Sequence, residues 1–345
     1  MDEILKVLST AVSYGGKEVS LVYWSIDNAQ ISPKESYAKL VKYYHNMEKT
    51  NPGSTFFIKT EADNCFKFFF MAFGQCIQRF RNIMRPLILV DNTTLKSKYQ
   101  GKLIIATCQD ANIQIYPLVF GIVDNENDLS MCWFFTKLRE VIGEVEDLAF
   151  VINWGQSIIN GIVEIFPDAH HGYCMYHIQG NLKTRYWGKD IVSLFGGAAE
   201  AYSIEECNRY MVEIGSKSFP TWDYLTKMGI EHWAHSYFPG HRYNMMASNN
   251  AESFNTLFKR DREFPILALI ENIRTKLQQW FHDRRVESHS CTITLAPAQE
   301  VKLFKAAEAA RKLNVEPLDE SCFSVECARH TVYMVDLNDR TCTCK

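Results

Sequence analysis

The stretch PLILVD, residues 86–91, decides the fold, because four aliphatic residues run directly into an aspartate, Asp91. A short continuous apolar run predicts a strand buried on both faces, with the acid at its C-terminal end. Two more strand-like runs follow, KLIIATC at residues 102–108 and IQIYPLVFGIV at residues 113–123. Their short connections favour antiparallel neighbours, so the three runs predict a meander.

Helix and strand patterns alternate after the meander. The helical patterns occupy residues 128–142 (with Asp128 as the expected N-cap), 156–165 and 177–186, and the strand patterns occupy residues 148–152 and 171–176. Three antiparallel strands followed by helix–strand alternation predict an α/β fold, a mixed sheet with flanking helices. This is the order of elements in the RNase H fold.

Five regions are expected along the chain. They are a mainly helical region at 1–85 with a short extended piece at 55–59, the first part of an RNase H-like core at 86–189, an all-helical insertion at 190–247, core helices at 248–290, and a tail at 291–345 with short strands near 331–337. The sheet is therefore expected to begin at residue 86, and the insertion is expected to interrupt the core.

Bulk composition excludes several classes of protein. The 345 residues are 47% hydrophobic and 22% charged, which is ordinary for a soluble globular protein. No apolar run approaches the roughly 20 residues that span a bilayer, so no membrane partner is expected. The net charge of -3 gives no global attraction to nucleic acid, so such binding must come from local basic patches. Eleven scattered cysteines do not form the pattern of a secreted disulfide framework.

Several short segments together resemble the Mutator-like element (MULE) transposases and the plant host proteins derived from them. These segments are RPLILVD (85–91), LKSKY (95–99), IYPL (115–118), DNEND (124–128), WFF (133–135), FPDAHHGYCMYH (166–177), NLK (181–183) and AESFN (251–255). The resemblance covers roughly residues 35–290. At the C-terminus, Cys342 and Cys344 resemble the first half of a SWIM-type zinc finger.

The resemblance implies an acidic triad that binds Mg²⁺ or Mn²⁺, with Asp91 as its first member and Glu252 as its third. The second position reads Asn153, followed by Trp154. An amide keeps an oxygen ligand but removes a negative charge, and a hard dication held mainly by charge binds less well. The expected function is a Mutator-type DNA transposase core, domesticated or decayed and deficient in cleavage. Whether the chain is an enzyme stays open, with the sequence favouring an inactive one.

Two alternatives remain open. A nearby acid such as Asp124 or Asp128 could replace the second member of the triad and keep an active metal-dependent transposase. The chain could instead be a transposase-derived transcriptional or protein-interaction module that uses its helical insertion.

Cysteine and histidine occur together at two places. Cys174 and His177 are expected to organise the core near the active centre, since two ligands do not complete a zinc site. Cys342 and Cys344 would bind Zn²⁺ only if a longer natural product supplied the remaining finger ligands.

Cationic side chains surround the first acid. Arg85, Lys96, Lys98 and Lys102 predict weak DNA binding through phosphates. A second set lies further along, and its interspersed acids favour a solvated helix face: Lys259, Arg260, Arg262, Arg274, Lys276, Arg284 and Arg285. The resemblance implies a nuclear protein whose partners are DNA and either further copies of itself or other nuclear proteins.

Overall fold

The computed structural model describes residues 32–62, 65–110, 112–185, 189–246, 256–290, 292, 295–326 and 332–343. Its main body consists of α2 (Pro33–Thr50), β1 (Thr55–Thr60), β2 (Phe66–Ala72), α3 (Gly74–Ile83), β3 (Leu87–Thr94), β4 (Lys102–Gln109), β5 (Ile115–Val123), α4 (Asp128–Ile142), β6 (Ala149–Ile152), α5 (Gln156–Ile165), β7 (His170–Tyr173), α6 (Met175–Arg185) and α12 (Ile266–Ser290). The segment between α6 and α12 contains α7 (Lys189–Glu200), α8 (Ile204–Lys217), α9 (Phe219–Lys227), α10 (Ile230–Trp233) and the short 3-10 turns η1 (His235–Tyr237) and η2 (Asp261–Glu263).

The seven strands of the body form one mixed sheet in the order β1-β2-β5-β4-β3-β6-β7. The predicted meander is confirmed, because β3 pairs antiparallel with β4 and β4 pairs antiparallel with β5. The next two strands pair parallel, β6 with β3 and β7 with β6. The predicted α/β class is therefore confirmed, and the strand order is compatible with the RNase H fold.

Two strands precede residue 86, where the sheet was expected to start. The expected extended piece is β1, and the aromatic run Phe66–Ala72 forms β2, which pairs with both β1 and β5. Five consecutive residues of β2 are buried. A strand covered on both faces shows no alternation, so its pattern does not separate it from a buried helix. The sheet thus begins at Thr55, before residue 86.

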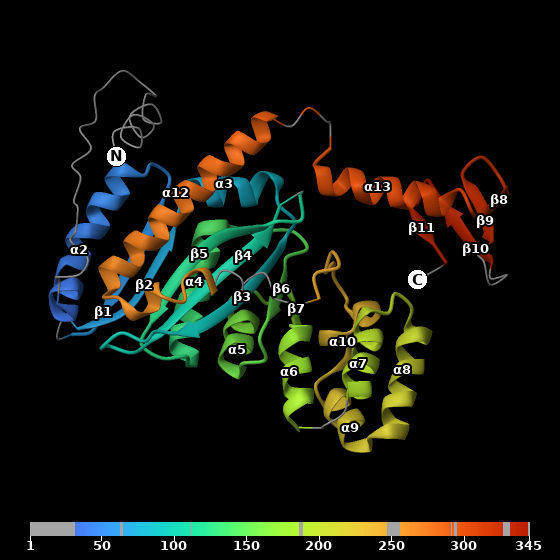
Figure 1. The fold of residues 1–345 in the computed structure, drawn as a ribbon, viewed down its shortest axis with the longest axis horizontal. Helices are drawn as coiled ribbons and strands as arrows, with labels where there is room; N and C mark the ends of the chain where they lie inside the picture. Colours follow the sequence, from blue (N-terminus) through green and yellow to red (C-terminus); the bar gives the residue numbers. More distant parts are fainter. Residues whose placement is uncertain are drawn as a thin grey trace.

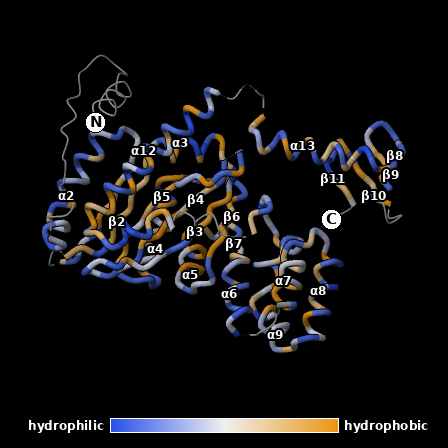
Figure 2. The backbone as a smooth tube through the Cα atoms, in the orientation of Figure 1, coloured by the Kyte–Doolittle hydropathy of each residue, from blue (hydrophilic) through white to orange (hydrophobic). Residues whose placement is uncertain are grey.

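Helices cover both faces of the sheet. On one face α3, α4 and α5 pack against the strands, and α2 and α12 lie side by side on the other (Figure 1). Successive residues of a strand point to opposite faces of the sheet. Ile104 packs with the layer of α3, α4 and α5, and Ile105 packs with the layer of α2 and α12. The hydropathy colouring shows the apolar residues concentrated between these layers (Figure 2).

The start of α4 differs from its expected form by one residue. The N-cap is Asn127, whose side chain accepts a hydrogen bond from the backbone N–H of Ser130, while the Ser130 hydroxyl accepts one from the Asn127 backbone N–H. Asp128, which the sequence predicted as the cap, is the first helical residue. A carboxylate there still favours the helix, because it lies at the positive end of the helix dipole.

The helical segment after α6 shares its core with the sheet. One continuous cluster of buried residues includes Phe150 of β6 together with Phe195 of α7 and Trp233 of α10. The Trp233 indole N–H also donates to the carbonyl of Leu225, 3.1 Å away. The region predicted as an all-helical insertion is helical over most of residues 190–237, while residues 238–246 form no helix, and the region packs against the edge strand β7.

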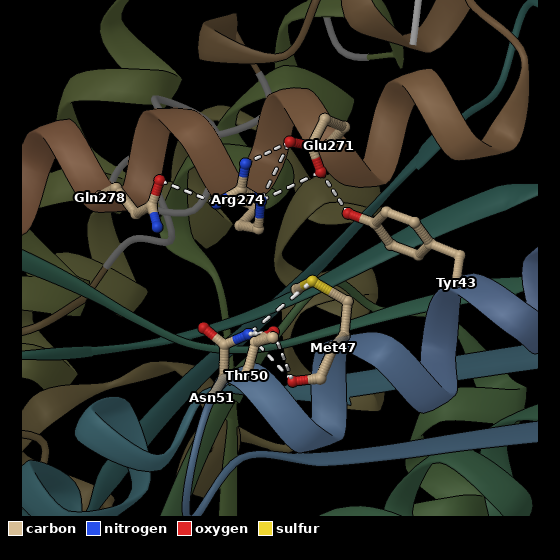
Figure 3. Close-up of polar contacts among 7 residues, drawn as sticks. All are labelled: Tyr43, Met47, Thr50, Asn51, Glu271, Arg274 and Gln278. Carbon is tan, nitrogen blue, oxygen red and sulfur yellow. Dashed lines mark hydrogen bonds and ion pairs between the residues drawn. The ribbon is translucent and has the colours of Figure 1, made fainter. Parts of the chain in front are cut away.

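Half-buried polar groups tie α2 to α12 (Figure 3). The Tyr43 hydroxyl of α2 donates to the Glu271 carboxylate of α12, and the Arg274 Nε donates to both Glu271 oxygens at 3.1 and 3.0 Å. Ser36, which is fully buried, accepts a hydrogen bond from the Leu267 backbone N–H at 2.9 Å, near the start of α12. Burial alone would raise the pKa of Glu271, but the hydrogen bonds from Arg274 and Tyr43 outweigh it and lower that pKa.

We expect Tyr43→Phe to lower the free energy of unfolding by about 2 kcal/mol, because it removes a hydrogen bond to a charged acceptor. Urea denaturation at pH 7, with Tyr202→Phe at an exposed tyrosine as the control, measures this loss. The contribution of the lowered Glu271 pKa is complete above the ordinary value of 4.5 and disappears as the pH falls through the lower folded pKa. The difference between the two variants should therefore shrink in acid, and a difference that persists at pH 2 would contradict the role of Glu271.

The tail contains a helix that was not expected from the sequence. This is α13 (Pro297–Ala310), followed by β8 (Asn314–Pro317), β9 (Cys322–Glu326), β10 (Val332–Asp336) and β11 (Thr341–Cys342), which form a second sheet extending away from the body (Figure 1). In the described part of the chain, no helix has both the length and the apolarity needed to cross a membrane.

Candidate functional site

Three neighbouring parallel strands carry the candidate residues at one level of the sheet. Asp91 was predicted to end its strand, but β3 continues to Thr94 because residues 91–94 still pair with β4. In the register of β3, β6 and β7, Val90 pairs with Ile152, and Ile152 pairs with Tyr173. The residues that follow these three are Asp91, Asn153 and Cys174. Because adjacent strands lie about 4.8 Å apart, the structure makes Asp91 and Asn153 neighbours.

Strand alternation directs these residues to a common face. Leu89 and Val151 belong to a small buried cluster that also contains Cys174, and Asp91 and Asn153 come two residues after Leu89 and Val151. Asp91 is only 4% exposed, and the backbone N–H of Cys174 donates to the Ile152 carbonyl at 2.8 Å. A buried carboxylate is expensive unless it is compensated, so a carboxylate at this strand end is typical of a functional position.

Glu126 is the described acid that the structure places beside Asn153. A methyl group built onto Gly155 would lie 2.7 Å from Glu126 Oε1 and 3.4 Å from Asn153 Oδ1, so both oxygens border the same small space. Asn153 Oδ1 is buried and has no hydrogen-bond partner within the described ranges. A side chain at position 155 would have to displace the Glu126 carboxylate.

The two acids suggested as substitutes have other contacts. Asp124 is exposed and accepts a hydrogen bond from the backbone N–H of Asn125 at 2.7 Å. Asp128 accepts one from the side chain of Asn160 on α5 at 3.1 Å. Glu126 was not anticipated, although it lies between these two acids, because spacing along a loop does not show which side chain turns toward β6.

A cavity of about 210 Å³ opens at the ends of β6 and β7. It is lined by residues from the loop after β6 and from the first turns of α6: Asn153, Trp154, Gly155, Cys174, His177, Ile178 and Asn181. The structure therefore brings Cys174 and His177 to the same cavity as Asn153, and their role in organising the core stays a prediction.

A buried arginine beneath β7 was not anticipated from the sequence. Arg242 is 2% exposed, and its guanidinium donates to the carbonyls of Tyr173 at 2.9 Å and His232 at 3.1 Å. Burial lowers its pKa to about 10, and nearby Cys174 opposes this shift. Arg242 thus fixes the end of β7 against α10 and holds Cys174 in place. It lies in a segment without strong helical or strand periodicity, so no local pattern marks it.

Glu252, the expected third acid, lies outside the described residues. The chain before it passes beside the site, because the Met246 carbonyl accepts a hydrogen bond from the Met175 backbone N–H at 2.8 Å. Met175 follows Cys174 directly. The assignment of Glu252 stays a prediction.

The expected DNA-binding cations fall into two places. Lys96, Lys98 and Lys102 lie at or beyond the C-terminal end of β3, near Asp91, whereas Arg85 precedes the opposite end of that strand. The Arg85 guanidinium lies 4.9 Å from the centre of the Tyr243 ring. The eight residues of β3 span about 26 Å, so Arg85 does not join the three lysines.

A cation from the second set joins the lysines instead. The Arg262 carbonyl accepts a hydrogen bond from the Lys96 backbone N–H at 2.8 Å, and the Arg262 guanidinium donates to the hydroxyl of Thr93. We call Lys96, Lys98, Lys102 and Arg262 the basic rim. Other cations of that set are paired with acids: Arg274 with Glu271, Lys276 with Asp261, and Arg284 with Asp110.

The terminal cysteines form no described metal site. Cys342 lies in β11 and is disulfide-bonded, and Cys344 lies outside the described residues. Among the residues whose placement is described, no group of three or more histidine, cysteine or acidic side chains is arranged to hold a metal ion.

Comparison with known proteins gives a family for the region that contains the site. The family model described as "MULE transposase domain" matches residues 87–181, which include Asp91, Asn153, Cys174 and His177. The chain is 23% identical over 180 residues to Protein FAR1-RELATED SEQUENCE 5 of Arabidopsis thaliana, covering 52% of this chain and 22% of that protein. It is 20% identical over 231 residues to Protein FAR1-RELATED SEQUENCE 4 of the same plant, covering 64% of this chain and 31% of that protein.

The chain therefore spans less than a third of the length of either relative. The matched domain holds the strands from β3 to β7 and the cavity that follows β6 and β7. Residues 87–181 therefore match the MULE transposase domain, and the chain is similar over part of its length to the two FAR1-related proteins.

Proposed function

We propose that this chain is a Mutator-type DNA transposase core that still binds DNA but has lost strand cleavage. The observation that carries the proposal is the position of Asn153, a neutral amide that directly follows β6, because Asp91 follows Val90, the β3 partner of the last β6 residue Ile152. Two-metal cleavage needs carboxylates that bridge or clamp dications at this place. Asp91 and Asn153 together supply one negative charge, which does not fit a pair of Mg²⁺ or Mn²⁺ ions.

The basic rim supports DNA binding through phosphates. Its members lie at the same end of β3 as Asp91, and neither Lys96 nor Lys98 has an ion-pair partner within the described ranges. Lysine acts on phosphate as a point charge and reads no base sequence, so this binding is weak and salt-dependent. The proposal places the protein in the nucleus, with DNA as a partner and with other copies or other nuclear proteins as further partners.

We expect the double variant Lys96→Ala/Lys98→Ala to bind duplex DNA more weakly than the unaltered chain. The slope of log Kobs against log salt concentration should become shallower by about 0.9 for each phosphate that the variant no longer neutralises. Fluorescence anisotropy from 50 to 200 mM salt measures the slope, with Lys302→Ala/Lys305→Ala on α13 as a control of equal charge. Equal losses of affinity in the two variants would contradict a role for the rim, and no binding of DNA by the unaltered chain would overturn the proposed function.

Glu126 favours a second candidate function, an active metal-dependent transposase. Its carboxylate borders the same space as the unpartnered Asn153 oxygen. Two oxygen acceptors facing one space without a donor between them are an arrangement that a hard cation satisfies. In this candidate, Glu126 supplies the charge that Asn153 lacks.

A further inference from the structure

We propose that the cavity beside Asn153 binds one unpaired base of DNA, which stacks on Trp154. This inference deepens the proposed DNA binding and rests on it. It concerns a different surface from the basic rim, because the cavity opens at the ends of β6 and β7 rather than beyond β3.

The first support is the solvent exposure of the Trp154 side chain. It lines the cavity yet is 42% exposed, which leaves a large aromatic surface in contact with water. The indole is steadied by two rings, Tyr173 at 6.0 Å and Tyr224 at 5.7 Å between centroids. A partly exposed aromatic ring held by its neighbours is a ready platform, because every nucleobase has a flat face that stacks on such a ring.

The second support is the polarity of the cavity wall. Asn153 Oδ1 is buried without a hydrogen-bond partner within the described ranges, and it lines the same cavity as Trp154. The amide of Asn181, which also lines the cavity, donates to the Tyr224 hydroxyl across a long 3.4 Å contact. Amide groups match the donor and acceptor pattern of a base edge, and a base N–H would satisfy the Asn153 oxygen.

The third support is positive charge on α6 beside the opening of the cavity. Helix α6, which supplies Asn181, continues with the exposed residues Lys183 and Arg185. The Arg185 guanidinium lies 5.7 Å from the centre of the Tyr224 ring, which itself packs on Trp154. A base seated on Trp154 would therefore have cations nearby for its phosphates. Aromatic stacking combined with flanking cations is the usual means of holding a single strand.

A base that is already unpaired enters such a cavity most readily, because no stacking or pairing must be broken. The expected ligand is thus a single strand, a bulge or an overhang of DNA rather than a fully paired duplex.

The test compares two DNA probes by fluorescence anisotropy: a fully paired duplex and the same duplex with one unpaired base. We expect Trp154→Ala to weaken binding of the bulged probe by roughly 5- to 150-fold, since stacking on one aromatic ring contributes that much per base. Binding of the paired duplex should change by less than about twofold. Trp154→Phe should retain most of the affinity. Phe219→Ala, which removes an exposed aromatic stacked on Trp222 outside the cavity, is the control and should change neither probe.

A second readout keeps the test valid if Trp154→Ala folds poorly. 2-Aminopurine at the unpaired position should lose fluorescence on binding the unaltered chain, because stacking quenches it. Asn181→Asp should weaken this response by placing a carboxylate at the base edge.

Equal effects of Trp154→Ala on both probes, or unchanged 2-aminopurine emission, would overturn the proposal while leaving duplex binding and the proposed function intact. A matching RNA bulge that binds more tightly than DNA would overturn the assignment to DNA. Failure of both probes to bind the unaltered chain would overturn the proposed function itself.

Discussion

Asn153→Asp should bind Mn²⁺ between about 10- and 1,000-fold more tightly than the unaltered chain, the largest change in ligand affinity that we expect. The added carboxylate would lie beside Asp91, and attraction between its charge and a cation about 4 Å away contributes up to ~4 kcal/mol per unit charge near a protein surface. Isothermal titration with Mn²⁺ and Mg²⁺ measures the affinity, and nicking of a labelled duplex measures any regained cleavage. Asn208→Asp on α8, whose side-chain oxygen accepts from the Tyr237 hydroxyl, is a control for the added charge.

The unaltered chain should neither bind Mn²⁺ tightly nor cut DNA. Cleavage by the unaltered chain would contradict the inactive interpretation. Glu126→Gln would then show whether Glu126 supplies the charge that Asn153 lacks. If Glu126 supplies the missing charge, Glu126→Gln abolishes metal binding and cleavage, whereas Asp124→Asn leaves both in place. If the site is inactive, Glu126→Gln changes neither measurement in the unaltered chain.

Trp233→Ala should lower the free energy of unfolding by about 3–5 kcal/mol, the range for removing a large buried aromatic side chain. Trp233 is fully buried, packs on Phe195 with 5.3 Å between ring centroids, and donates to the Leu225 carbonyl. Because its cluster continues into the sheet, the whole body should unfold in one transition at lower urea concentration. Circular dichroism and tryptophan fluorescence, recorded on the same samples, measure whether the two transitions coincide.

Val212→Ala on α8 is the matched control, since it truncates an exposed side chain of the same segment and should change stability by less than about 0.5 kcal/mol. Hydrogen exchange gives a second check, because Arg242 links α10 to the carbonyl of Tyr173 in β7. Loss of protection should therefore reach β7 in Trp233→Ala. Exchange confined to α7–α10, with the strands unaffected, would show that this segment folds as a separate unit.

Local pattern was sufficient for the centre of the fold. Helices α4 and α5 have the predicted bounds, residues 128–142 and 156–165, because their apolar residues recur at helical spacing. The meander and the two parallel strands followed from the order of elements, since short connections leave few ways to pair neighbouring strands. The placement of Asn153 near Asp91 follows from the same order, because Asp91 lies in β3 and Asn153 directly follows β6, which pairs parallel with β3.

Contacts between distant parts of the chain decided the rest. The sequence alone placed Asp91 in one buried strand and Asn153 directly after another, since periodicity is a local property, but it did not show that β3 continues past Asp91 to Thr94. Only the tertiary structure decided that Glu126 faces Asn153, that Arg242 lies beneath β7, and that Arg262 rather than Arg85 joins Lys96. Such neighbours are selected by packing between elements, and the free energy of that packing depends on shape and burial that no spacing along the chain records.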